Sequence, residues 1–141
     1  MMDHFSVWLA QNGLTELFTT PAGDSMYINC EKQFGVIRKM GEYAAQSFYL
    51  DDIIECKTYH DEYMIAEWGI GMPWKLYERS TRYTTNQVYM NIRFKNSAVL
   101  KLQLFRGTNG NIKRDTNQHI DLLNYACRIT QAVISIIPRQ G

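Results

Sequence analysis

Aromatic and cationic side chains alternate in one stretch of the chain, residues 69–87, and these residue types can bind anions. The residues that carry the pattern are Trp74, Lys75, Tyr77, Arg79, Arg82 and Tyr83. A cation pairs with a phosphate or carboxylate, and a neighbouring ring supplies contact area that loses water on binding. The stretch therefore predicts a site for a protein partner or for an anionic, phosphate-containing or nucleotide-like small molecule. The alternative is a loop folded back on the domain, with packed rings and solvated charges.

Other kinds of chemistry have little support in the sequence. His60, Asp61 and Glu62 offer metal-ligand atoms, but adjacent residues in a turn rarely converge on one ion. Gly69 and Gly71 lack the third glycine of a dinucleotide-binding loop, and no serine lies in a Gly-x-Ser-x-Gly elbow. We therefore predict no metal site, no cofactor and no catalytic residues, and expect a binding module. A small enzyme whose catalytic residues meet only in the fold is a weaker alternative.

Composition limits the class of protein and the compartment. The chain has 141 residues, which fits one domain, and a formal net charge of +1, which does not favour nucleic acid as a partner. Cys30, Cys56 and Cys127 fall in apolar segments, so three buried, reduced thiols are expected. No stretch approaches the roughly 20 apolar residues of a membrane-spanning helix, and no export signal is recognisable at the start. We expect a cytoplasmic protein.

The element that organises the rest of the chain is an amphipathic helix predicted over residues 118–137. Its apolar positions recur with helical spacing and form one broad stripe together with Thr130: Ile120, Leu122, Leu123, Ala126, Cys127, Ile129, Thr130, Val133, Ile134 and Ile137. Pro138 prevents the helix from continuing. Such a stripe cannot stay in water, so the helix must cover a sheet.

The sheet is predicted from alternating segments joined by short turns. The expected strands lie in residues 26–30, 34–37, 46–50, 53–60, 63–68, 88–94 and 100–104. Residues 69–87 are predicted to be irregular, because Gly69, Gly71 and Pro73 deny regular structure to their start. A short helix carrying Phe5 and Trp8, ended by Gly13, precedes the strands.

These elements predict one domain over residues 1–141, with an N-terminal helix and lead-in at 1–23 and a core at 24–137. The class is α+β, in which antiparallel strands form a partly open barrel or bent sandwich closed by the terminal helix. Four tyrosines lie on the less buried phase of their strands: Tyr27, Tyr49, Tyr59 and Tyr89. They could form a surface for a partner or a homo-oligomer, unless the short N-terminal helix covers them.

The segments at 26–34, Met-Tyr-Ile-Asn-Cys-Glu-Lys-Gln-Phe, and 50–56, Leu-Asp-Asp-Ile-Ile-Glu-Cys, resemble uncharacterised bacterial domains with a pleckstrin-homology-like (PH-like) fold. The hairpin at 88–105 and the following helix continue the resemblance in the same order. It implies a PH-like binding module with no common ligand. The leading expectation is a non-enzymatic module that binds a protein, with a bacterial or phage regulatory protein as the expected class of partner.

Overall fold

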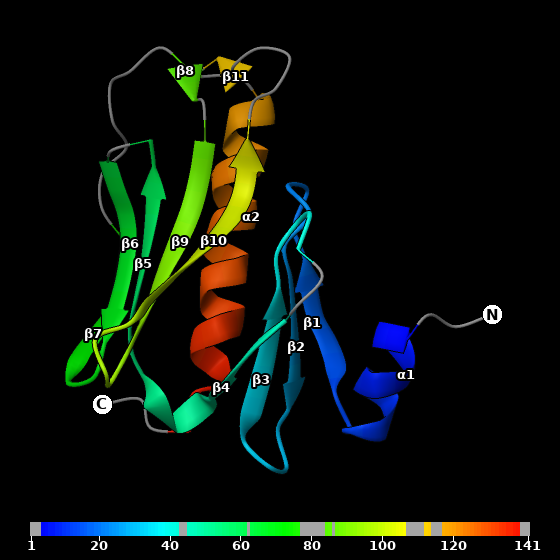
Figure 1. Ribbon diagram of the computed structural model, residues 1–141. Coiled ribbons are helices and arrows are strands. Elements are labelled where there is room, and N and C mark those ends of the chain that lie inside the picture. The colour runs from blue at the N-terminus through cyan, green and yellow to red at the C-terminus, as the bar shows by residue number, and fades with distance from the viewer. Residues whose placement is uncertain are drawn as a thin grey trace.

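The structure, a computed structural model, describes residues 4–42, 45–61, 63–76, 84–85, 87–106, 112–113 and 117–138. These residues form two antiparallel sheets, a separate two-stranded pair, and one helix near each end of the chain (Figure 1). The two larger sheets are not closed into a barrel. The predicted strand-rich α+β class with a short N-terminal and a long C-terminal helix is therefore confirmed.

The chain begins with helix α1 (His4–Gln11). Gly13 ends the helix with φ 66°, and the N–H of Leu14 reaches back to the carbonyl of Leu9 at 2.9 Å, a helix-ending geometry that favours glycine. The Phe5 ring meets the Tyr27 ring edge-on at 5.3 Å, and the Arg38 guanidinium lies 4.5 Å from the Phe5 centroid. These contacts hold α1 against one face of the first sheet.

The first sheet is an antiparallel meander in the order β1-β2-β3-β4. Its strands are β1 (Thr15–Thr19), β2 (Ser25–Asn29), β3 (Phe34–Arg38) and β4 (Gln46–Tyr49). Met26, Ile28 and Ile37 point into the core, as the predicted hairpin requires. β1 and β4 are the edges of this sheet.

A single 3-10 turn, η1 (Leu50–Asp52), leads from β4 directly into the second sheet. That sheet has the order β10-β9-β5-β6-β7. Its strands are β5 (Ile53–His60), β6 (Tyr63–Gly69), β7 (Met72–Leu76), β9 (Gln87–Phe94) and β10 (Val99–Arg106). Two short strands, β8 (Thr84–Thr85) and β11 (Ile112–Lys113), pair with each other.

The predicted alternation in β9 and β10 is confirmed at Met90, Ile92 and Leu102, which are fully buried, but in β10 it breaks at the bulge after Gln103, which is buried as well. In the turn between these strands, the left-handed residue is Ser97, at φ 71°, and not Asn96. The Asn96 side chain instead accepts a hydrogen bond from the Ala98 N–H at 3.0 Å, which supports the turn from outside. A bulge between Ile53 and Glu55 leaves Ile54 half-buried.

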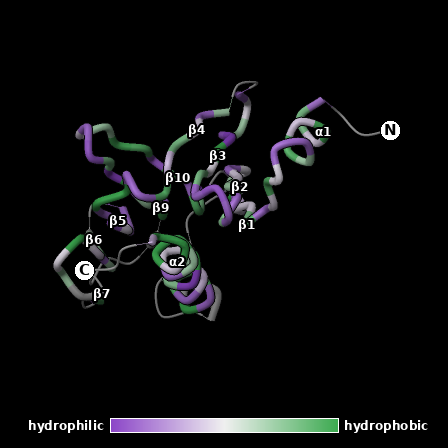
Figure 2. Tube along the Cα trace, turned by 90° about the horizontal axis from the view of Figure 1, so that it is seen from below, coloured by the Kyte–Doolittle hydropathy of each residue, from purple (hydrophilic) through white to green (hydrophobic). Residues whose placement is uncertain are grey.

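Helix α2 (Asn117–Ser135) covers the second sheet and completes the core. Its buried residues belong to the predicted stripe, of which Ile120 is exposed and Cys127 half-buried: Leu122, Leu123, Ala126, Ile129, Thr130, Val133 and Ile134. The hydroxyls of Thr130 on α2 and Thr58 on β5 are 2.6 Å apart. Figure 2 shows α2 nearly end-on, on one side of both sheets and away from α1.

A buried carboxylate joins the two sheets. Asp24 is 3% exposed, and its two oxygens accept backbone N–H groups from Met40 and Gln103, each at 2.9 Å. The Thr20 hydroxyl donates to the carbonyl of Gln103 at 2.7 Å. Because Gln103 belongs to β10, these bonds lock the β1–β2 turn to the edge of the second sheet.

Two sequence expectations are wrong. Residues 69–87 are not irregular at their start, because β7 occupies Met72–Leu76. Gly71, at φ 80°, supplies the tight turn that lets β7 pair with β6, and Pro73 is tolerated because β7 is an edge strand. All three cysteines are free, but Cys30 is exposed and Cys127 half-buried, so only Cys56 is the predicted buried thiol.

Candidate functional site

The structure describes two of the six predicted loop residues, Trp74 and Lys75, and it does not bring these two side chains together. Trp74 and Lys75 are consecutive in β7, so their side chains leave opposite faces of the sheet. Trp74 packs partly buried against the core, and Lys75 lies opposite Glu67 of β6. Tyr77, Arg79, Arg82 and Tyr83 lie outside the described residues. An anion site in this loop therefore stays a prediction.

The four tyrosines do not share one surface. Tyr27 and Tyr49 belong to the first sheet, and Tyr59 and Tyr89 to the second. Tyr59 and Tyr89 stack at 5.2 Å, and the Lys101 ammonium lies 4.3 Å from the Tyr89 centroid. Phe5 of α1 covers Tyr27, as the alternative interpretation expected, whereas Tyr49 is 66% exposed.

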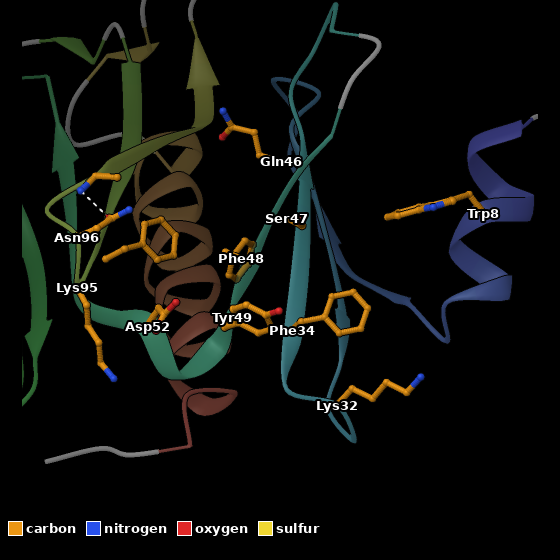
Figure 3. Close-up of a pocket in the computed structure, with 12 residues that line it drawn as sticks. Trp8, Lys32, Phe34, Gln46, Ser47, Phe48, Tyr49, Asp52, Lys95 and Asn96 are labelled. Atoms are coloured by element: carbon orange, nitrogen blue, oxygen red, sulfur yellow. Dashed lines mark hydrogen bonds between the residues drawn. The ribbon is translucent and has the colours of Figure 1, made fainter.

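Tyr49 belongs to a large open groove of about 960 Å³ that runs around strand β4 (Figure 3). Its lining comes from α1, the β2–β3 turn, β4 with η1, and the β9–β10 turn: Trp8, Lys32, Phe34, Gln46, Ser47, Phe48, Tyr49, Asp52, Phe94, Lys95, Asn96 and Ala98. The volume is at the upper end of the range of about 300–1,000 Å³ that ligand pockets occupy. The groove therefore has room for side chains of a second molecule.

The middle of this groove is an unpaired strand edge. The N–H of Leu50 bonds the Gln33 carbonyl at 2.9 Å, and antiparallel pairs alternate between bonded and non-bonded residues. Counting back along the β3–β4 register, Phe48 and Gln46 turn their backbone groups toward β3. Ser47 and Tyr49 therefore direct theirs outward, where no described strand pairs with them.

Apolar side chains flank this edge on both faces of the sheet. Phe34 and Tyr49 are cross-strand partners on the face that α1 covers, and Trp8 of α1 points toward them. On the other face, the Phe48 ring lies 5.5 Å from the Phe94 ring. An extended chain added beside β4 would thus find apolar surface for both phases of its side chains.

Gly35 makes the Phe48 position possible. It lies directly opposite Phe48 in the β3–β4 pair, and a Cβ at this position would come 2.6 Å from Phe48 Cζ. The absence of a side chain lets the ring lie flat across β3. The glycine therefore shapes one wall of the groove.

The charged residues of the groove gather at its Tyr49 end. Lys32, Asp52 and Lys95 lie there, whereas the Gln46 end is uncharged (Figure 3). Backbone contacts fix the turns that carry both lysines: the Lys32 N–H donates to Asn29 Oδ1, and the Lys95 N–H donates to the Asp52 carbonyl, each at 2.9 Å. These bonds therefore fix the backbone positions of both lysines beside the strand edge.

Two reactive groups outside the groove, Cys56 and His60, are buried, whereas the Cys30 thiol is exposed. Burial, and secondarily the charge of Glu55, raises the pKa of the Cys56 thiol to about 12, so it is not a thiolate at neutral pH. His60 is 1% exposed, with Nε2 3.7 Å from Asp61 Oδ2. The described residues contain no cluster of three His, Cys, Asp or Glu side chains suited to a metal ion. Among the same residues, neither helix is long and apolar enough to cross a membrane.

Sequence reasoning predicted β4 as a strand but missed the groove. The edge position of β4 depends on the order of strands in two sheets, and the flanking Trp8 and Phe94 lie far from β4 in sequence. One signal was present: the segment Gln46-Ser47-Phe48-Tyr49 contains neither proline nor charge, unlike most protected edges.

Comparison with known proteins adds no relative. No protein-family model, curated protein or solved structure matches this chain.

Proposed function

We propose that this chain is a non-enzymatic, PH-like interaction module that binds an extended segment of a partner protein along the free edge of β4. The observation that carries the proposal is the coincidence of that edge with the groove. Ser47 and Tyr49 offer outward backbone groups at the place where aromatic side chains flank the strand on both faces. Strand addition uses these two features together, since main-chain bonds give affinity and flanking pockets give specificity.

The partner class and the compartment belong to the same proposal. A bacterial or phage regulatory protein remains the class of partner that we propose from the sequence. We place the protein in the cytoplasm, because its three cysteines are free thiols and reducing compartments favour unpaired cysteine.

A proline at position 47 tests the proposal at a single hydrogen bond. Ser47→Pro removes an N–H that points away from β3, so the β3–β4 ladder keeps its bonds. Ser47→Ala keeps the N–H and removes the hydroxyl, which makes it the matched control. Both variants are first compared with wild type by thermal unfolding, so that only folded proteins enter the binding assay.

The assay uses peptides selected on the wild-type protein from a phage-displayed library of random twelve-residue sequences. We expect the selected peptides to bind wild type and Ser47→Ala equally and to lose at least about tenfold in affinity for Ser47→Pro, because the bond from the Ser47 N–H is removed and the peptide carbonyl that would accept it is left unpaired. Amide hydrogen exchange at Ser47 and Tyr49 should slow when the peptide is bound. Equal binding to Ser47→Pro, with unchanged exchange at these two amides, would refute strand addition at β4.

A further inference from the structure

The two ends of the β4 groove differ in charge, and the difference bears on the sequence of a bound segment. Lys32 and Lys95 lie at the Tyr49 end, on turns of the two different sheets, whereas Gln46 and Ser47 line the other end (Figure 3). Both lysine side chains are exposed. Any extended chain beside β4 therefore passes from an uncharged region to a region where two cations approach from opposite sides.

The two lysines are available for a ligand. Within the described residues, neither Lys32 nor Lys95 forms an ion pair, in contrast to Lys57, whose ammonium lies 3.4 Å from Glu55 Oε1. Asp52 shares the same end of the groove, but it meets Lys95 through backbone atoms, with no ion pair between their side chains. Among the residues that line this end of the groove, one carboxylate beside two ammonium groups leaves an excess of positive charge.

The direction of β4 determines which end of a bound segment lies beside the two lysines. β4 runs from Gln46 toward Tyr49, so its C-terminal end carries the lysines. Every strand pair of the first sheet is antiparallel, and antiparallel pairing is slightly more stable per residue than parallel pairing. An antiparallel fifth strand would enter the groove at the Tyr49 end and leave it at the Gln46 end. Its N-terminal part would then lie beside Lys32 and Lys95.

We infer that the groove recognises a protein segment in which one or two acidic residues directly precede a short stretch with apolar side chains at consecutive positions. The acidic residues meet Lys32 and Lys95. The following residues pair with β4 and place alternate side chains against Trp8 and Phe34 on one face and against Phe48 and Phe94 on the other. This inference rests on the proposed function, since it names the partner of the same site.

The test is a parallel selection from the random twelve-residue library on wild type and on three variants. Lys32→Glu combined with Lys95→Glu reverses the charge at the Tyr49 end. Lys39→Glu combined with Arg128→Glu changes the net charge by the same amount away from the groove and is the matched control. Ser47→Pro reports whether enrichment depends on the strand edge at all. Thermal unfolding verifies that each variant is folded.

We expect wild type and the control to enrich acidic residues immediately N-terminal to an apolar stretch, and the Lys32, Lys95 variant to enrich basic residues there. A selected acidic peptide should lose about threefold in affinity for each lysine reversed, as solvent-exposed ion pairs are weak, and the loss should shrink at high salt. These results would support the inference.

Other outcomes overturn either the inference or the function beneath it. Apolar peptides that depend on Ser47 but show no acidic bias would overturn the acidic partner and leave strand addition intact. Acidic residues enriched on the C-terminal side would overturn the antiparallel direction. Enrichment unaffected by Ser47→Pro would overturn the proposed function itself. A wild-type dimer that Ser47→Pro converts to monomer would assign the edge to a second copy of this chain and overturn a partner segment.

Discussion

Strands β4 and β7 are both edges, one in each sheet, and they differ in how they meet solvent. β7 contains Pro73, which has no N–H, and the exposed Lys75, two devices that discourage further strand pairing. β4 contains neither a proline nor a charged residue, although its Tyr49 is exposed, as Leu76 of β7 is. Under the proposed function, exposed apolar side chains alone do not mark a binding edge, since both strands have them. The backbone must also be free to pair, and this condition separates β4 from β7.

The largest expected effect comes from the glycines that support the two edges. Gly35→Val would force its side chain into the Phe48 ring, and we expect it to destabilise the fold by about 2–3 kcal/mol, the cost of an overpacked site. Gly71→Ala, in the β6–β7 turn, meets no atom within 4 Å. It should cost only the roughly 1 kcal/mol of a left-handed residue.

Urea unfolding of both variants measures the difference in the free energy of unfolding. Peptide binding should also fall for Gly35→Val, because its Phe48 wall is displaced, and should be unchanged for Gly71→Ala. If the two variants were equally stable and bound equally, Gly35 would have no role in shaping the β4 edge.

A smaller effect on stability is expected at Cys56, which lies on β5, two strands away from β7 in the second sheet. Cys56 pairs with Trp68 of β6, and burial raises its pKa from 9.0 to about 12. The neutral thiol therefore stabilises the fold fully below pH 9, and this contribution is lost as pH rises from 9 toward 12, because the unfolded chain ionises first. At pH 10 we expect the loss from this group to be about 1 kcal/mol.

The loss is measured as the change in unfolding free energy between pH 8 and pH 10, with Cys56→Ala compared with wild type. Cys56→Ala should show a smaller change by the amount given above. Cys30→Ala is the matched control in the first sheet, since Cys30 is exposed and should leave the wild-type pH dependence in place. Identical pH dependence of the unfolding free energy in all three proteins would contradict a raised pKa of the buried Cys56 thiol.

The smallest effect is expected when the protection of β7 is removed. Pro73→Ser with Lys75→Thr restores an N–H and removes a charge at an edge where Met72 and Leu76 are exposed. We expect weak, concentration-dependent self-association, visible by light scattering only at high protein concentration. The same variant with Ser47→Pro should associate equally, because the new contact does not use β4. Association that disappears with Ser47→Pro would instead locate it at β4.

Local patterns in the sequence predicted the elements well and their arrangement poorly. The α2 stripe and the β9–β10 alternation were recognisable because each is a repeat over consecutive residues, and burial follows it. β7 was missed because Gly71 and Pro73 were taken to break structure, whereas in an edge hairpin they form it. The β4 groove could not be predicted, because Trp8 and Phe94 flank β4 in the fold but are far from it in the sequence. Strand order is a property of long-range pairing, and no short window of residues reports it.

The bonds of Asp24 also have a kinetic consequence. The first sheet is a meander of neighbouring strands, so its contacts close short loops and form quickly. The bond from Gln103 to Asp24 spans 79 residues, and the Phe94 wall belongs to the same distant half of the chain. On the ribosome, β4 is therefore made before the turn that flanks it. A nascent chain presents the β4 edge without its Phe94 wall until β9 and β10 emerge, and in that interval wrong pairing with another chain competes with folding.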